Sequence, residues 1–511
     1  MCMQKENDAL TNRFVMLPAA LTVLALAAAG ALWPERFGAV AKQMLLFTTT
    51  NFGWFYLLTV FVIVIFLLGL AFSRYGSIRL GPADSRPEFP LLTWIAMLFS
   101  CGFGAGLVFW GVAEPMSHFF TPPFQEMGAQ SVPAARVAMG YSFFHWGVSQ
   151  WSVFALAGLG IGYMQFRKSR DGLVSTALEP VIGTRQGFKN TVDVLAVVAT
   201  VMGIATSLGL GVLQISGGLQ SVMGWAGSLK LQLLIIAIMC AAYMLSSTTG
   251  LHRGIRWLSN INLGLCLVLL LFVFVAGPTL FILNAFTLGL GDYLTHFVEY
   301  SLRMTPYRGG TWVRDWTVFY WAWAIAWSPF VGAFIARISM GRTIREFIVG
   351  VLIVPPVIAC VWIATFGGMA LHEDLRHAAG IAAAVDRDVA LALFELYEHL
   401  PLNSMLSVLS ILLIFTFLVT SADSATYILA GMVSRGHPHP SQALKVFWGG
   451  MMSLIAAVLL AAGGLSSLQT ASLVAALPFA ALLILLMAAL VRLLRSELPP
   501  AGHDELQRHV T

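Results

Sequence analysis

The sequence predicts an all-α integral membrane protein with twelve transmembrane helices. Apolar residues make up 58% of the 511 positions and charged residues only 10%, whereas a soluble chain has roughly 25% charged residues. A chain this poor in charge cannot cover a globular surface that faces water, so lipid is expected to be its main solvent. Twelve apolar runs are long enough to cross ~30 Å of hydrocarbon. Helices are expected because backbone polar groups in lipid must be paired internally, and strand-like alternation of apolar residues is absent.

The first apolar run is about 20 residues long, which suits a retained membrane helix better than the shorter core of a signal peptide. The fifth run is rich enough in glycine to be bent. An interfacial helix is expected in 284–315, which is too polar to span, and a short external helix in 371–403. The expected spans cover residues 14–33, 54–74, 91–113, 138–163, 191–219, 230–248, 258–283, 316–338, 346–370, 404–432, 443–463 and 470–494.

The distribution of Lys and Arg predicts the orientation. If both termini lie on one side, that side carries most of the 29 basic residues, so the positive-inside rule places both termini in the cytoplasm. The net charge of +5 is small for this length and does not indicate nucleic-acid binding. The five cysteines have neither metal-site nor disulfide spacing. An intramembrane enzyme or a sensor is the alternative class, but the sequence contains no catalytic motif in a supporting context.

The third span contains the glycine stretch Ser100-Cys-Gly-Phe-Gly-Ala-Gly106. Each of its three glycines weakens a helix by ~1 kcal/mol relative to alanine. Transporters use interrupted helices of this kind to bind substrate and ions near the middle of the membrane. Close packing of small residues between helices is the alternative explanation.

The eighth span carries an aromatic stripe. Trp316, Tyr320, Trp323 and Trp327 fall on one helical face, and Ser328-Pro329 is expected to break the helix just beyond it. Aromatic faces that converge on a cavity attract cations, and quaternary ammonium groups are their best-known ligands. A core stripe or an interfacial belt is the alternative.

The fourth span contains His145, Trp146, Trp151 and Phe154. Trp146 and Trp151 do not share a helical face, so at most one of them points straight at a given site. His145 is a candidate proton carrier, although a hydrogen-bonded structural histidine is the commoner case.

The tenth span offers oxygen ligands. The backbone carbonyl of Phe417 and the hydroxyls of Thr420 and Ser421 share a face, and a site made only of oxygens suits a hard cation such as Na⁺. The alternative is that these hydroxyls bond back to their own helix. Asp423 is an intramembrane carboxylate, which indicates function or a buried structural role.

Five motifs together carry a family resemblance: GFGAGLVFWGVAEP, HWGVSQW, ATSLGLGVLQI, WAWAIAWSPFVGAFIARISMGRTIRE and TSADSATYIL occur in this order. They closely resemble the betaine/carnitine/choline transporter family over essentially the whole chain. The resemblance implies a homotrimer in the bacterial cytoplasmic (inner) membrane, with a LeuT-like core of two inverted five-helix repeats, each opening with an interrupted helix. The implied division is a cytoplasmic N-tail 1–13, two peripheral helices in 14–90, the first repeat 91–283, a connector 284–315, the second repeat 316–463, the last helix region 464–494 and a cytoplasmic C-tail 495–511.

The resemblance also implies a substrate site. The family's aromatic box corresponds to Trp146, Trp151, Phe154 and Ala324, where Phe154 replaces a usual Tyr and Ala324 a usual Trp. The loss of a Trp face forfeits ~1–2 kcal/mol of cation–π attraction, and it enlarges the pocket or admits a less methylated head group. The other expected substrate-binding residues are Gly104 in the glycine stretch, Trp323 and Trp327, and Trp316 at an outer site.

A sodium site is implied in the same way. It consists of the carbonyls of Ser100, Phe103 and Phe417 and the hydroxyls of Thr420 and Ser421. Sodium-independent members carry an arginine in the seventh span, where this chain has Asn262-Leu263 and no basic residue from 257 to 285. Sodium coupling is therefore favoured, with proton coupling through Asp423 as the alternative.

The sequence therefore predicts a sodium-coupled secondary transporter that imports a small zwitterionic or quaternary-ammonium solute, such as betaine, choline or carnitine, by alternating access. It is predicted to have no enzymatic activity, no cofactor besides the coupling ion and no nucleic-acid partner. The alternative is proton-driven uptake, or precursor/product exchange, of a less methylated substrate such as taurine, an ectoine or a sulfonium compound.

Overall fold

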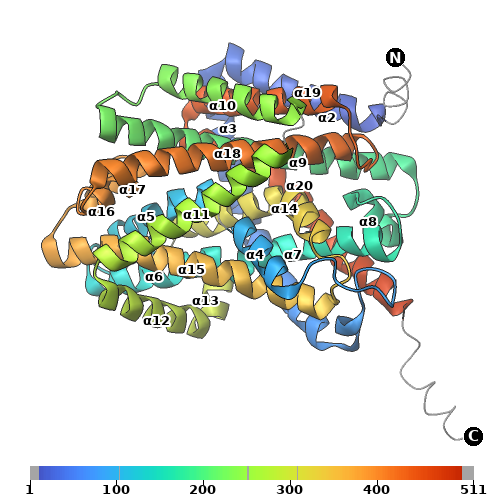
Figure 1. The fold of residues 1–511 in the computed structure, drawn as a ribbon, viewed down its shortest axis with the longest axis horizontal. Coiled ribbons are helices and arrows are strands. Elements are labelled where there is room, and N and C mark those ends of the chain that lie inside the picture. Colours follow the sequence, from blue (N-terminus) through green and yellow to red (C-terminus); the bar gives the residue numbers. More distant parts are fainter. Residues whose placement is uncertain (1–10, 103, 250–251, 308, 498–511) are drawn as a thin grey trace, which may run out of the picture.

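The computed structural model is a bundle of helices that describes residues 11–102, 104–249, 252–307 and 309–497. Long helices lie side by side through the bundle (Figure 1). Within the described ranges there is no β-strand, only one isolated bridge between Arg79 and Thr343. Most of the two predicted tails lies outside these ranges. The prediction of an all-α protein is confirmed.

Ten helices of the described chain are long and apolar enough to cross a membrane. Each covers one of the predicted spans, and the lengths of several exceed the ~20 residues that a span needs. The twelve-span count and the inverted repeats stay predictions. The ten are α2 (Arg13–Leu32), α3 (Pro34–Phe72), α9 (Gln186–Met223), α10 (Leu229–Thr249), α11 (His252–Ala276), α14 (Phe319–Arg337) with the π-turn η3 (Arg314–Val318) before it, α15 (Ile344–His377), α18 (Asn403–Val433), α19 (Gln442–Gly463) and α20 (Leu465–Arg495).

The third and fourth predicted spans are each divided between two helices. The third consists of α4 (Leu91–Gly102) and α5 (Ala105–Phe120), so it is interrupted at the glycine stretch, as predicted. The fourth consists of α6 (Val132–Trp146) and α7 (Val148–Gly162), and its break at Gly147 was not predicted. The glycine-rich fifth span is one uninterrupted helix, α9.

The predicted break at Ser328-Pro329 is wrong, because α14 continues through Pro329 to Arg337. Proline has no N–H to donate to the carbonyl four residues earlier, which is that of Ile325. The hydroxyl of Ser328 donates to this carbonyl at 2.8 Å and takes over the missing bond. The eighth span is therefore not an interrupted helix like the third.

Shorter helices occupy the connections. The chain turns at Gly277-Pro278, so α11 ends at Ala276 and α12 begins inside the predicted seventh span. α12 lies beside α15 at the edge of the bundle and also packs against α6 (Figure 1). The predicted helix in 371–403 is present as two short ones. These connecting elements are η1 (Arg74–Ser77), α8 (Val174–Ile182), α12 (Thr279–Thr295), α13 (Phe297–Leu302), α16 (Ile381–Arg387), η4 (Val389–Leu391) and α17 (Ala392–Tyr397), with the π-turn η2 (Tyr163–Arg167) after α7.

Close packing of α7 against α14 places the aromatic side chains of both. A Cβ on Gly332 of α14 would lie 2.8 Å from the backbone nitrogen of Gly158 on α7, so the two backbones touch. One turn further on, Gly162 faces Ala336, and the two helices therefore run parallel. Trp151 lies seven residues before Gly158 on α7, and Ile325 lies seven residues before Gly332 on α14. Because the helices run parallel, Trp151 lies beside the central turn of α14.

Candidate functional site

The aromatic stripe of α14 is continuous. Ring centroids are 6.5 Å apart for Trp316 and Tyr320, 6.2 Å for Tyr320 and Trp323, and 6.3 Å for Trp323 and Trp327. Tyr320 is fully buried and Trp323 is only 5% exposed. An interfacial belt would face lipid, so the stripe belongs to the interior of the bundle.

Residues of α6 and α5 converge on Trp323 of α14. The ring of Trp146, the last residue of α6, lies 6.1 Å from that of Trp323 at an angle of 86°. Gly106 on α5 lies against both rings, because a Cβ there would sit 2.7 Å from Cη2 of Trp323 and 3.5 Å from Cη2 of Trp146. The interrupted third span thus brings its glycine stretch against two of the predicted substrate-binding tryptophans.

The remaining residues of the predicted box lie on α7 and α14. Trp151 and Phe154 form an edge-to-face pair with ring centroids 5.3 Å apart, and both are buried. Ala324 is buried on α14, at the level that the helix register assigns to Trp151. Gly104 precedes α5 at the break, and a Cβ there would meet nothing within 4 Å, so it adjoins open space.

The indole nitrogens of Trp323 and Trp327 differ in their partners among the described residues. The indole Nε1 of Trp327 is buried and makes no hydrogen bond, whereas Nε1 of Trp323 donates to the hydroxyl of Ser207 at 3.3 Å. A buried donor without an acceptor is costly. Trp327 is therefore able to donate to an acceptor group of a bound solute.

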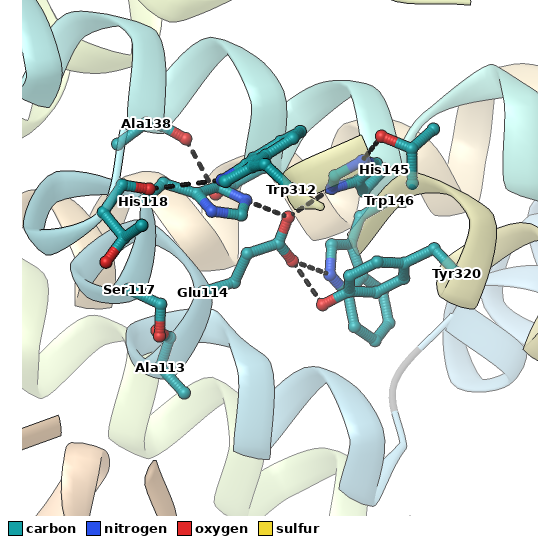
Figure 2. Close-up of polar contacts among 12 residues, drawn as sticks. Ala113, Glu114, Ser117, His118, Ala138, His145, Trp146, Trp312 and Tyr320 are labelled. Atoms are coloured by element: carbon teal, nitrogen blue, oxygen red, sulfur yellow. Dashed lines mark hydrogen bonds and ion pairs between the residues drawn. The ribbon is translucent and has the colours of Figure 1, made fainter. Parts of the chain in front are cut away.

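Glu114 on α5 is the hub of a buried polar cluster (Figure 2). Its Oε1 lies 2.6 Å from Nδ1 of His145 and 3.2 Å from Nε2 of His118. Its Oε2 accepts a hydrogen bond from Nε1 of Trp146 at 2.9 Å and another from the hydroxyl of Tyr320. The carboxylate and both imidazoles are fully buried. Four donors from three helices thus surround one carboxylate.

The proton positions in this cluster follow from the acceptor. An ionised carboxylate only accepts, so Nδ1 of His145 carries a proton, and its Nε2 is hydrogen-bonded to the hydroxyl of Thr317 at 2.9 Å. His118 faces the carboxylate through Nε2, and its Nδ1 has no partner among the described residues. A buried charge persists only when it is hydrogen-bonded in this way. Glu114 therefore supplies a fixed negative charge that is bonded directly to the ring of Trp146.

Two groups of side chains in the described chain have the donor types and spacing of metal ligands. One is Glu114 with His118 and His145, whose facing atoms already bond one another. The other comprises His372, Glu373 and His377 at the end of α15.

The predicted outer residue, Trp316, contacts the hub. Its ring lies 4.5 Å from that of His118 and 5.6 Å from that of Trp110. It stacks on Tyr320, which in turn bonds Glu114. Trp316 thus reaches Trp323 through Tyr320, so it is one residue removed from the central site.

The residues of the predicted sodium site are only partly placed. Ser100 is exposed on α4, whose main packing partner is α15, and Phe103 lies outside the described residues. Phe417, Thr420 and Ser421 lie on α18, where the hydroxyl of Thr420 donates to the carbonyls of Thr416 and Phe417 at 3.0 Å. This back-bonding uses the hydroxyl proton and leaves oxygen lone pairs for a cation. The sodium site stays a prediction.

Asn262, in the part of the seventh span where the sequence has no basic residue, takes part in the same region. Its Oδ1 accepts a hydrogen bond from the hydroxyl of Thr416 at 2.6 Å, which joins α11 to α18. Asn262 is buried, with 1% of its surface exposed. A neutral amide therefore occupies this position one turn from Thr420.

Sequence reasoning missed Glu114. The predicted third span, 91–113, stops one residue short of this carboxylate. The available signal was His118 four residues later, because residues at i and i+4 share a helical face. An acid and a histidine on one face of an apolar helix indicate a buried pair.

A comparison with known proteins identifies the family. A family model described as betaine/carnitine/choline family transporter (BCCT) matches residues 14–499. This chain belongs to the BCCT family. It is 59% identical over 499 residues to an ectoine/hydroxyectoine transporter of Virgibacillus pantothenticus, covering 98% of this chain and 100% of the relative. BCCT relatives also include the glycine betaine transporter OpuD of Bacillus subtilis, 44% identical over 93% of this chain and 94% of the relative.

A third BCCT relative is the osmo-independent choline transporter BetT1 of Acinetobacter baylyi, which is 40% identical over 87% of this chain and 86% of the relative. These relatives are named transporters, so this BCCT protein is a membrane transporter and not an enzyme. The resemblance drawn from the five motifs is confirmed.

Proposed function

We propose that this protein is a sodium-coupled importer of ectoine or hydroxyectoine. The observation that carries the substrate is end-to-end identity of 59% to a transporter named for these two solutes, against 44% to a glycine betaine transporter and 40% to a choline transporter. Import of glycine betaine or another quaternary ammonium compound is the second candidate, because it is supported by those two relatives.

The chemistry of the site supports a flat cation. Ectoine is a zwitterion in which a carboxylate is attached to a ring that carries a delocalised amidinium. The faces of Trp146 and Trp323 offer cation–π attraction to such a ring. The negative charge of Glu114, bonded to Trp146, adds to this attraction.

The substrate's carboxylate also has a partner in this proposal. The unpartnered Nε1–H of Trp327 lies on the same helical face as Trp323 and is the donor we assign to it. Alanine at position 324 leaves room for a ring and removes the aromatic face that a trimethylammonium group favours, whereas phenylalanine at 154 keeps its aromatic face. The substitution at 324 therefore favours an ectoine over betaine.

Coupling and access complete the proposal. Thr420, Ser421 and the carbonyl of Phe417 on α18 are proposed to bind Na⁺ together with carbonyls at the break of the third span. The interruptions beside Gly104 and at Gly147 are the points at which the helices change angle as the site opens alternately to the two sides. Proton coupling is the alternative, through Asp423 or through the Glu114–His145 pair, whose carboxylate and imidazole share a hydrogen bond.

The protein is further proposed to be a homotrimer in the bacterial cytoplasmic membrane with both termini in the cytoplasm. Four leucines on α12 support an assembly or lipid contact at this helix, because 48–72% of each side chain is exposed: Leu280, Leu283, Leu288 and Leu294. The molecular mass of the detergent-solubilised protein, measured by light scattering with the detergent subtracted, decides between monomer and trimer.

Uptake of labelled ectoine into proteoliposomes tests the function. An inward sodium gradient is expected to drive saturable uptake, and unlabelled hydroxyectoine is expected to compete better than glycine betaine, choline, carnitine or taurine. Trp323→Ala serves as the matched inactive protein. Uptake indifferent to sodium but driven by a proton gradient contradicts the coupling, and preferential competition by glycine betaine contradicts the substrate.

A further inference from the structure

The break in the fourth span leaves a backbone donor without a partner from its own helix. In an unbroken helix the N–H of Val148 bonds the carbonyl of Phe144, four residues earlier. At the break, α6 ends at Trp146 and α7 begins at Val148, and Gly147 between them has no side chain to cap α7. The first N–H groups of a helix need an acceptor from elsewhere.

A tyrosine from a distant helix supplies that acceptor. The hydroxyl oxygen of Tyr293 on α12 accepts the N–H of Val148 at 2.9 Å. Tyr293 is buried, with 4% of its surface exposed. A Cβ at position 147 would overlap the Tyr293 hydroxyl, so the tyrosine occupies the space that the glycine leaves. Tyr293 therefore caps α7 from outside the fourth span.

Two further contacts hold α12 in the register that this cap needs. The neighbouring Asp292 accepts two hydrogen bonds from Arg136 of α6, at 2.7 and 2.6 Å. One turn before Tyr293, Gly289 lies so close to α6 that a Cβ there would sit 2.8 Å from Cγ of Met139. α12 is thus fixed to α6 on the same side of the break at which its tyrosine reaches α7.

The break separates the two tryptophans of the aromatic box. Trp146 is the last residue of α6 and Trp151 lies in the first turn of α7, and both are buried. The angle between α6 and α7 decides how far apart these two rings lie. That angle depends on what holds the first turn of α7, and Tyr293 bonds to that turn.

We propose that Tyr293 is a positioning residue for substrate binding: its hydroxyl fixes α7 at the Gly147 break and thereby sets the distance between Trp146 and Trp151. Tyr293 acts through the backbone of Val148 and does not itself contact the solute. The inference rests on the proposed function, because it takes the two tryptophans as parts of the substrate site.

The test compares Tyr293→Phe with the unmodified protein. This change removes only the hydroxyl, and the loss of one hydrogen bond is expected to raise the Kd for ectoine and the KM for uptake about fivefold. Vmax is expected to stay within about twofold, since a positioning defect of this kind weakens binding. Tyr300→Phe is the matched control. Tyr300 on α13 is as buried as Tyr293, but its ring stacks on Tyr141 of α6. Tyr293→Phe with an unchanged Kd, or an equal rise in Tyr300→Phe, overturns the proposal.

A double-variant cycle separates positioning from general loosening of the fold. Trp151→Leu removes the aromatic ring that Tyr293 is proposed to position and leaves the N–H of Val148 in place. In the Trp151→Leu background, Tyr293→Phe is expected to change the Kd less than about twofold, because coupled residues are not additive. A fivefold effect that persists in this background overturns the proposal. If the unmodified protein binds glycine betaine and no ectoine, the proposed substrate fails, and the same cycle with glycine betaine decides the role of Tyr293.

Discussion

The carboxylate of Glu114 accepts a hydrogen bond from the indole nitrogen of Trp146 at 2.9 Å, which ties a charge on α5 to an aromatic ring on α6. The same oxygen accepts from Tyr320 of α14. One carboxylate therefore joins the interrupted third span, the interrupted fourth span and the aromatic stripe. If one of these helices shifts, either its hydrogen bonds to the other two break or the other two helices move with it.

Glu114→Gln is expected to abolish uptake and lower thermal stability. The glutamine has one acceptor oxygen in place of two, so the donors that face its amide nitrogen lose their partner. Each buried donor left unpaired costs about 1–3 kcal/mol. Uptake in proteoliposomes and the unfolding temperature of the purified protein measure the two effects.

Glu299→Gln is the control for the charge change, because Glu299 is an exposed acid on α13. It is expected to retain uptake and stability. If the Glu114→Gln protein transports at the rate of the unmodified protein, the carboxylate has no role in the site.

Gly106→Ala is expected to raise KM at least tenfold. The added methyl group would lie 2.7 Å from the ring of Trp323, so the ring must move, and it is one of the faces proposed to hold the solute. Overpacking of this kind typically costs 1–3 kcal/mol. Gly69→Ala on α3 is the control, because a Cβ there meets nothing within 4 Å. Equal KM values for the two variants contradict the placement of Trp323 in the site.

Sequence patterns predicted those elements whose signal is local. Apolar length located the ten spanning helices, and the glycine stretch located the break beside Gly104. The break at Gly147 was missed because one glycine in an apolar run is common. Tyr293, which accepts the N–H of Val148 at this break, lies 145 residues after Val148 in the sequence. The break at Pro329 was wrongly predicted because a serine hydroxyl replaces the lost bond. Glu114 was missed because its four partners come from three helices, and their convergence is tertiary.

Replacing Thr420 and Ser421 together by alanine is expected to raise the sodium concentration needed for half-maximal uptake at least tenfold. Both hydroxyl oxygens are proposed ligands, and an alanine offers none. Initial uptake rates measured across a series of sodium concentrations give this value. A potassium salt keeps the ionic strength constant, because choline is itself a candidate solute. Ser424→Ala, on the same helix and bonded to the carbonyl of Thr420, is expected to leave it unchanged. An unaltered sodium dependence in the double variant rules out this ion site.

The ion pair of Glu497 predicts a pH dependence of stability. Hydrogen bonds from Arg167, and also from Lys168 and Tyr163, lower the pKa of this carboxyl to about 2, against a partial opposing effect of burial. Since the folded pKa lies below the unfolded value of about 4.3, the stabilisation is present above pH ~4.3 and is lost as pH falls towards 2. Glu497→Gln is therefore expected to unfold at a lower temperature than the unmodified protein at pH 7, with the gap closing below pH ~4. Glu35→Gln, an exposed acid on α3, should show no such gap, and a gap for Glu497→Gln that is independent of pH contradicts the ion pair.

Ala324→Trp is expected to shift selectivity from ectoine towards glycine betaine. A tryptophan face adds about 1–2 kcal/mol of attraction for a trimethylammonium group, which corresponds to roughly tenfold in affinity. The same ring takes up space beside Trp151 that the ectoine ring is proposed to use. Ala324→Leu adds bulk without an aromatic face, so it is expected to weaken ectoine uptake without strengthening that of betaine. The ratio of the KM values for the two solutes, measured for all three proteins, separates bulk from aromatic attraction. A ratio that is the same in the unmodified protein and in both variants shows that position 324 does not line the solute.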